Sequence, residues 1–231
     1  MITSSDNAKL KGTRKLAARK HRDITGRFVA EGEDLVAAAA AAGWEPVWQL
    51  SAAGSGLPGE EVAPALLAEV SLLGSGTRTL AVYEQRWGNL SSPCVALFGV
   101  HDPGNVGTVV RSAAAFGAAS VAIGPESADP YSPKAVRASM GAIFTVPVAR
   151  VTGAEELPVP RVGLVAREGE PLDRLEEIGT LLVGGERQGL PPAVLDACEQ
   201  RAHIPIATES LNAAMAATVG LYEANRIARR G

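Results

Sequence analysis

The feature that most constrains this chain is a regular alternation, from residue 94 onward, of short strand-like runs with longer segments of helical spacing. The expected strands cover residues 94–100, 120–124, 145–150, 161–167, 178–186 and 202–207, and the expected helices cover 105–117, 132–144, 191–200 and 209–230. Continuous apolar runs such as "CVALFGV" are typical of strands buried on both faces, and strands that alternate with helices form parallel sheets. This part of the chain therefore predicts an α/β domain with a parallel sheet.

The first 85 residues repeat the alternation on a smaller scale. A basic helix over residues 3–22, capped by Ser4 or Ser5, precedes expected strands at 27–32, 46–51 and 79–85 and expected helices at 33–43 and 61–74. The segment "RWGNLSSP", residues 86–93, is polar, rich in turn-forming residues and ends in proline. Such segments mark domain boundaries. We therefore expect a small α/β domain over residues 1–88 and a second domain over 89–231.

The charge of the chain is unevenly distributed. The whole sequence carries a formal net charge of −3, but residues 1–30 hold eight Lys and Arg residues against two Asp residues, a local net charge of +6. A concentrated basic segment on an acidic protein indicates a polyanionic partner. The alternative interpretation, a solvated helix face, is equally compatible with the charge alone.

The cysteines and histidines give no sign of a metal centre. Cys94 and Cys198 lie far apart in the sequence, and the three histidines are scattered, so no zinc-ligand spacing is present. Two lone cysteines fit buried, reduced side chains in a cytoplasmic protein. The longest apolar run, residues 35–42, is too short to cross a bilayer. No metal and no membrane partner is expected.

The stretch "DPGNVGTVVRSAAAFGA", residues 102–118, predicts a turn that opens into an amphipathic helix. An apolar face repeats with helical spacing along Val106, Val109, Val110, Ala113, Ala114 and Gly117. Asn105 is placed to cap the helix, and Arg111 lies off the apolar face. Helix geometry alone leaves Arg111 as either a surface residue or a residue that points into a cleft.

Two later segments carry polar groups at strand or helix ends. In "LLVGGERQGLP", residues 181–191, Glu186 follows a buried strand and a glycine pair, at the kind of strand end where open α/β sheets bind ligands. In "ESLNAAMAATVGLYE", residues 209–223, Ser210 can cap a final helix whose first turns are rich in small residues, namely Ala213, Ala214, Ala216, Ala217 and Gly220. The usual nucleotide-binding fingerprints are absent.

The order and combination of these three segments resemble the SpoU/TrmH family of RNA ribose 2′-O-methyltransferases, within the SPOUT superfamily. The resemblance covers about residues 94–231, and the segment "KHRDITGRFVAEGEDLV" resembles the ribosomal-protein-like RNA-binding domain of members that modify rRNA. It implies a SPOUT-type parallel sheet with a C-terminal trefoil knot, S-adenosylmethionine (SAM) as cofactor, and a homodimer. The substrate implied is RNA, with 23S rRNA favoured and tRNA less so.

The resemblance also implies roles for particular residues. The catalytic set would be Asn105, Arg111, Glu186, Ser210 and Asn212, and the SAM pocket would include Gly184, Ile204 and Leu211. RNA would contact the basic residues Lys11, Arg14, Lys15, Arg19 and Lys20. Arg111 has been cast as a base in this family, but a guanidinium resists deprotonation, so binding phosphate and stabilising charge is the favoured role. Arg187 departs from the glycine usual after the motif glutamate.

Two other function classes compete with this one. The first is a non-catalytic RNA-binding or ribosome-assembly protein on the same scaffold, which the retention of all five motif residues disfavours. The second is an unrelated α/β enzyme that binds anionic small molecules at its glycine loops, which the basic N-terminal segment disfavours.

Overall fold

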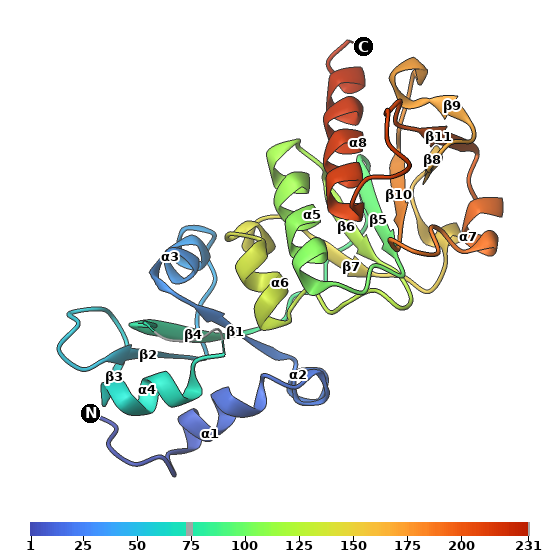
Figure 1. Ribbon diagram of the computed structural model, residues 1–231. Coiled ribbons are helices and arrows are strands. Elements are labelled where there is room, and N and C mark those ends of the chain that lie inside the picture. The colour runs from blue at the N-terminus through green and yellow to red at the C-terminus, as the bar shows by residue number, and fades with distance from the viewer. Residues whose placement is uncertain (73–75, 231) are drawn as a thin grey trace.

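The chain forms two sheets, one in each half of the sequence, and the computed structural model describes residues 1–72 and 76–230 (Figure 1). The first sheet has the strand order β1-β4-β2-β3, with β4 antiparallel to both β1 and β2. The elements of this N-terminal module are α1 (Ala8–Lys15), α2 (Arg19–Thr25), β1 (Arg27–Glu31), α3 (Glu33–Ala41), β2 (Trp48–Ala52), β3 (Glu60–Val62), α4 (Pro64–Val70) and β4 (Thr79–Glu84).

The second sheet has the order β7-β6-β5-β10-β8-β11-β9, and every described pair in it is parallel, as the sequence predicts. Its strands are β5 (Cys94–Phe98), β6 (Ser120–Ile123), β7 (Val148–Arg150), β8 (Arg161–Val165), β9 (Glu170–Pro171), β10 (Thr180–Gly184) and β11 (Gln200–His203). The helices are α5 (Pro103–Ala115), α6 (Pro133–Ala138), α7 (Pro192–Asp196) and α8 (Ala213–Ala228).

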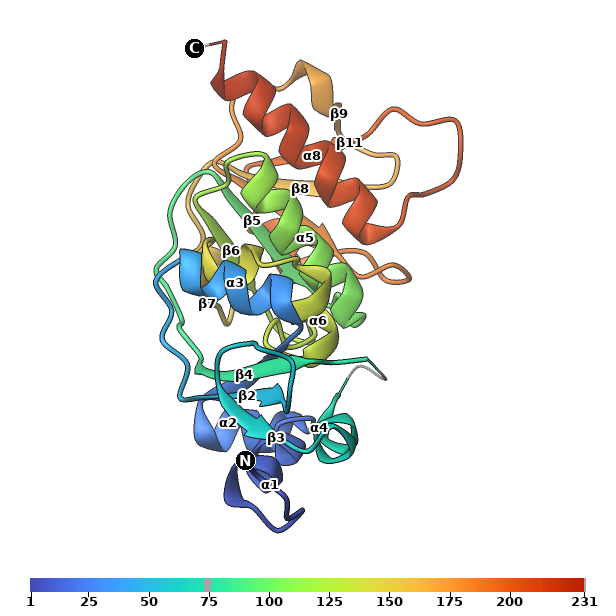
Figure 2. The same cartoon turned by 90° about the vertical axis from the view of Figure 1, so that its left-hand side faces the viewer.

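The two faces of the parallel sheet follow from the alternation of side chains along each strand. In β5, Val95 and Leu97 pack with α5 and α8 in the larger core cluster, whereas Cys94, Ala96 and Phe98 face the opposite cluster with α7. Helices α5 and α8 lie side by side on the first face (Figures 1 and 2). The fully apolar β5 run is therefore buried on both faces.

A seam between the two halves is packed with aromatic side chains. Six of the ten aromatic residues, all in the described ranges, belong to this seam: Phe28, Trp44, Tyr83, Trp87, Tyr131 and Phe144. The Trp44 Nε1–H donates to the Phe144 carbonyl oxygen at 2.9 Å. Since aromatic rings bury large areas, we infer that the two halves are held in a fixed relation.

A buried ion pair crosses the same seam. The Arg22 Nε–H donates to Asp129 Oδ2 at 2.7 Å, and the two side chains are 4% and 3% exposed. The Arg22 Nη1 group also donates to the carbonyl oxygens of Leu16 and Ala17, so both charges have several partners. Asp129 lies in the loop between β6 and α6, and the pair therefore ties α2 to the second half of the chain.

Several predicted boundaries are wrong, for local physical reasons. The basic segment breaks at Leu16–Ala18 into two helices, because the Arg22 side chain takes the Leu16 and Ala17 carbonyls, and Asn7 rather than Ser4 or Ser5 caps the first helix. The helix expected over 132–144 ends at Ala138, where the left-handed residues Met140 and Gly141 turn the chain. Ala114 and Gly117, predicted on the buried face of α5, are exposed. The predicted end of helix 61–74 lies outside the described residues.

Candidate functional site

The polar groups of the three sequence segments meet at the carboxyl end of the parallel sheet. Strand β10 ends at Gly184, and the next residues form a tight turn in which the Gly189 N–H donates to the Gly185 carbonyl at 2.9 Å. A Cβ on Gly184 would collide with the carbonyl group of Gly189, so this position needs glycine. We name residues 185–189 the glycine loop.

Three motif side chains form a continuous hydrogen-bonded chain. The Asn105 Nδ2–H donates to Glu186 Oε1, and the Asn212 Nδ2–H donates to Asn105 Oδ1 at 3.4 Å. The Asn212 Oδ1 in turn accepts from the backbone N–H groups of Ala214 and Met215. The structure thus brings together Glu186 of the glycine loop, Asn105 of α5 and Asn212 at the start of α8, although Asn105 and Asn212 are 107 residues apart in sequence.

The start of α5 is fixed by an aspartate that the sequence prediction overlooked. Asp102, not Asn105, caps the helix: its Oδ1 accepts from the Gly104 and Asn105 N–H groups at 2.6 and 3.1 Å. The hydrogen bond from Lys134 Nζ and those two backbone donors hold the pKa of Asp102 below its usual value. An Asp followed by Pro at the first helical position was the available signal. Asn105 is thereby freed from capping and can turn its side chain to Glu186.

The start of α8 also differs from the prediction. Asn212 is the N-cap, and Ser210 lies two residues before it with an exposed side chain and no capping bond. The Asn212 side chain accepts hydrogen bonds from two backbone N–H groups of the first turn. If Ser210 were the cap, those two groups would need another acceptor. Ser210 instead lines the cavity described next.

A cavity of about 330 Å³ lies beside the glycine loop, within the size range of small-molecule sites. Gly184, Ile204 and Leu211, the three residues expected to bind the cofactor, all line it, together with Ser210, Glu186 and Arg187. Its walls are the ends of β8 and β10, the segment after β11 and the first turn of α8. A groove lined by glycine backbone, apolar side chains and a few polar groups suits a ligand that has both an apolar body and polar groups.

Arg111 stands apart from this polar chain. It is exposed on α5, six residues beyond Asn105, which corresponds to about 9 Å along a helix axis. Among the described residues, its side chain has no hydrogen bond or ion pair. The prediction that Arg111 lies off the apolar face is confirmed, but within one copy of the chain the structure does not bring it to Glu186 or Asn105.

The five basic residues predicted to bind RNA lie on α1 and α2, and all are exposed. Three already have acidic partners: Lys11 with Asp6 at 2.8 Å, Arg14 with Glu69 at 3.7 Å, and Arg19 with Asp23 at 3.6 Å. Lys15 and Lys20 have no such partner in the described part of the chain. The basic segment is therefore less free to attract anions than its formal charge suggests.

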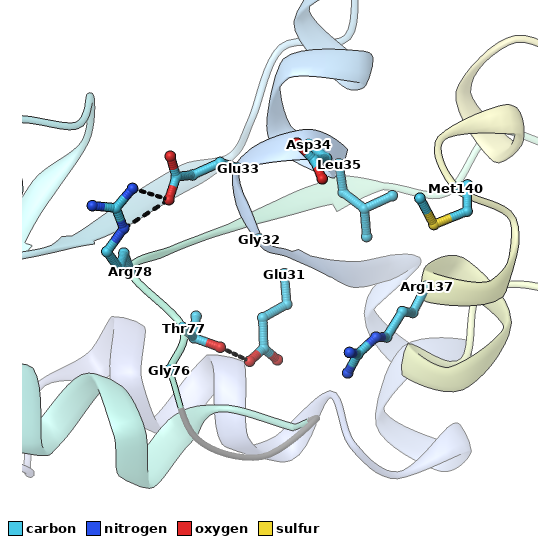
Figure 3. Close-up of a pocket in the computed structure, with 10 residues that line it drawn as sticks. All are labelled: Glu31, Gly32, Glu33, Asp34, Leu35, Gly76, Thr77, Arg78, Arg137 and Met140. Atoms are coloured by element: carbon cyan, nitrogen blue, oxygen red, sulfur yellow. Dashed lines mark hydrogen bonds and ion pairs between the residues drawn. The ribbon is translucent and has the colours of Figure 1, made fainter.

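A second hollow lies at the seam, away from the motif residues. It has a volume of about 380 Å³ and is lined by the junction of β1 with α3, by residues 76–78 and by α6 and the turn after it (Figure 3). None of the predicted catalytic or cofactor residues lines it. Sequence reasoning missed this hollow because its two walls come from segments about 100 residues apart.

The described ranges offer neither a metal centre nor a membrane-spanning helix. No group of three or more His, Cys, Asp or Glu side chains within residues 1–72 and 76–230 is arranged to hold a metal ion. No described helix combines the length and apolar character needed to cross a membrane.

The fold agrees with comparisons to known proteins. The model of the SpoU rRNA methylase family matches residues 92–222, and the model of the MRM3-like substrate-binding domain matches residues 7–91. The chain belongs to the SpoU rRNA methylase family, and it follows the family's parallel α/β fold.

Individual relatives agree with this membership. The 23S rRNA (guanosine(2553)-2′-O)-methyltransferase RlmP of Bacillus subtilis is 30% identical over 96% of this chain and 97% of its own length. The 23S rRNA (uridine(2479)-2′-O)-methyltransferase of Streptomyces viridochromogenes is 38% identical, but the match covers 54% of this chain and 49% of that protein. The chain covers only 37% of another relative, the ribosomal RNA small subunit methyltransferase G 2 of Syntrophobacter fumaroxidans.

A solved structure matches almost the whole chain. The AdoMet-bound rRNA methyltransferase of Sinorhizobium meliloti superposes with a TM-score of 0.87 at 30% identity, covering 97% of both chains. The similarity therefore includes both halves of the chain and their relative placement.

Proposed function

We propose that this protein is a SAM-dependent methyltransferase that methylates a ribose 2′-hydroxyl of RNA, and that its RNA substrate is 23S rRNA. The observation that carries the proposal is the hydrogen-bonded chain Glu186–Asn105–Asn212 at the edge of a cavity lined by glycine backbone. The named relatives that act on 23S rRNA support the choice of rRNA over tRNA.

The cavity beside the glycine loop fits SAM. Gly184, Ile204 and Leu211 would hold it, with backbone groups of the glycine loop facing its polar ends. A Cβ at Gly184 would collide with backbone atoms of Gly189, and a Cβ at Gly185 would collide with those of Gly99. This wall of the cavity therefore requires glycine at both positions. When bound, SAM supplies an electrophilic methyl group on its sulfonium sulfur.

The side chains around the cavity would prepare the acceptor. Asn105 and Asn212, fixed by Glu186 and by the first turn of α8, would hydrogen-bond the ribose, and Ser210 would do so from the cavity wall. Arg111 would bind the neighbouring phosphate and stabilise negative charge on the 2′-oxygen, which would release its proton to water as it takes the methyl group from the sulfonium sulfur. Holding donor and acceptor in fixed geometry supplies a large part of the acceleration.

The arrangement of the chain adds three further proposals. Residues 1–88 would form the RNA substrate-binding domain, with Lys11, Arg14, Lys15, Arg19 and Lys20 contacting RNA, and residues 89–231 would form the methyltransferase domain. The segments around the glycine loop and the start of α8 would form the trefoil knot of the SPOUT superfamily. The protein would act in the cytoplasm.

We also propose a homodimer formed through α8 and α5. Met215, Val219 and Tyr222 recur along one face of α8 and are 62%, 37% and 54% exposed. Tyr222 packs edge-on against Phe116 at the end of α5. A second copy covering this apolar face would also bring a second Arg111 to the region, which matches an active site shared between subunits.

The test combines cofactor binding with methyl transfer. We expect the purified protein to bind SAM in a calorimetric titration and to transfer tritiated methyl groups to rRNA. The variant Arg111→Ala should keep SAM binding but lose transfer, because Arg111 lies outside the cofactor cavity. Transfer by Arg111→Ala at the wild-type rate would contradict the assigned role, and SAM binding without any transfer by the wild type would favour a non-catalytic RNA-binding protein.

A further inference from the structure

The hollow at the seam has an unusual distribution of charge. One wall, from the N-terminal module, includes Glu31 at the end of β1, and the other wall includes Arg137 of α6 (Figure 3). In that view the Arg137 side chain extends toward the Glu31 carboxylate from the opposite side of the hollow. The structure gives Arg137 no hydrogen bond or ion pair within the described residues. The Glu31 carboxylate, a hydrogen-bond acceptor, and the Arg137 guanidinium, a donor with no partner among the described residues, therefore line the same hollow.

The Glu31 carboxylate is held rigidly. Its Oε1 accepts from the hydroxyls of Ser71 and Thr77, and its Oε2 accepts from the Leu72 N–H at 2.9 Å. The residue is only 8% exposed. A carboxylate offers about four lone-pair sites, and donors in the described part of the chain fill three of them, so capacity for a ligand that enters the hollow remains among these residues.

An apolar side completes the hollow. Met140 lines it and is 57% exposed, with a left-handed backbone (φ 49°), and Gly141 follows at φ 91°. A Cβ on Gly141 would lie 2.6 Å from the Cβ of Ala38 in α3, so this turn packs closely against the N-terminal module. The turn thereby presents the Met140 thioether at the hollow, where sulfur can pack against an aromatic ring.

We propose that the seam hollow binds an unstacked guanine base of the RNA substrate. This inference rests on the proposed function, because it takes RNA to be the substrate. Guanine presents N–H donors on its Watson–Crick edge, which Glu31 would accept, and the O6 and N7 acceptors that arginine binds in a bidentate manner, which Arg137 would donate to. Proteins that recognise RNA by sequence read splayed bases in this way, with a side chain stacked on the ring.

The charges of the hollow disfavour a phosphate. Arg78 is engaged by Glu33 at 2.6 Å, and Asp34 adds an exposed carboxylate to the lining. The acidic groups therefore outnumber the single free cation among the described lining residues, and an anionic ligand would be repelled. Adenine fits less well, because its N1 lone pair would face the Glu31 carboxylate.

The test measures base preference in the full-length protein. Fluorescein-labelled RNAs, with about five uridines on each side of a central guanosine, adenosine or inosine, would be titrated in fluorescence anisotropy. We expect the guanosine RNA to bind about tenfold tighter than the adenosine RNA, as one good bidentate contact supplies. Inosine, which lacks the N2 amino group, should fall between them. Arg137→Ala should reduce the preference for guanosine over adenosine to the part that Glu31 supplies, whereas Arg174→Ala, which removes another arginine outside the hollow, should keep the full preference.

Two outcomes would overturn the proposal. Equal affinity of the wild type for the guanosine and adenosine RNAs would exclude base reading, and an equal loss for both RNAs in Arg137→Ala would make Arg137 a phosphate contact. Methylation kinetics separate this inference from the proposed function. Arg137→Ala should raise the KM for rRNA about tenfold with kcat and SAM affinity unchanged, and an inactive wild type would contradict the proposed function without deciding the guanine preference.

Discussion

The carboxyl edge of the parallel sheet and the basic surface of the N-terminal module hold their polar groups in different ways. At the sheet edge, Glu186, Asn105 and Asn212 bond to one another and to the start of α8. On α1 and α2, Lys11, Arg14 and Arg19 pair with acids that are themselves exposed. Exposed ion pairs contribute little and exchange easily, so phosphates can replace the acids. The first region is held in a fixed geometry, as the proposed catalytic role requires, and the second can exchange its partners, as the proposed contact with RNA requires.

The buried ion pair of the seam should give the largest effect on stability. Arg22→Ala leaves Asp129 charged and buried, which costs about 3–5 kcal/mol in comparable pairs. The matched control Arg19→Ala removes an exposed pair on the same helix and should cost at most about 1 kcal/mol. The free energy of unfolding from urea titrations measures both, and equal decreases would show that the seam is not a rigid connection.

Substitutions at the carboxyl edge of the parallel sheet should change the rate of methyl transfer rather than the stability of the protein. Asn105→Ala removes a hydrogen-bond donor that we propose lies next to the reacting atoms, and such removals lower kcat by about 10²–10³. Thr108→Ala, one turn further along the exposed side of α5, should change kcat less than twofold. Single-turnover methyl transfer at saturating SAM measures the ratio of each variant's rate to the wild-type rate. A change confined to the KM for RNA would place Asn105 in recognition instead.

The basic surface should give the smallest and most salt-dependent effect. Replacing Lys11, Arg14 and Lys15 with Gln should weaken RNA binding and flatten the plot of log K against log salt by about 0.7 for each phosphate that the variant no longer neutralises. SAM affinity and kcat should not change. The salt slope is measured by titrating RNA at several salt concentrations, and an unchanged slope would remove these three residues from the RNA-binding surface.

Local patterns predicted the elements of the sheet better than the contacts between them. The apolar run of β5 and the off-face position of Arg111 followed from periodicity, and both agree with the structure. The helix N-caps were harder to predict, because two residues near each helix start can serve as the cap. The structure uses Asp102 rather than Asn105 for α5, and Asn212 rather than Ser210 for α8. The Asn105 side chain bonds to Glu186, whose position depends on the tertiary fold.

The seam could not have been predicted from spacing. Arg22 and Asp129 are 107 residues apart, and nothing in the basic segment distinguishes Arg22 from its neighbours that remain exposed. The same holds for Glu31 and Arg137, which line the same hollow only because α6 packs against β1. Such pairs depend on how two sheets dock, and a single sequence carries no local signal for that geometry.

The position of the transferred methyl group decides whether the protein acts on a ribose 2′-hydroxyl. Purified protein would be incubated with SAM and unmodified 23S rRNA transcript, and the product would be mapped by resistance of the adjacent phosphodiester to alkaline hydrolysis. We expect one protected position that is seen only with SAM and disappears with Asn105→Ala. A methyl group on a base, or no transfer by a protein that binds SAM and RNA, would contradict the proposed function.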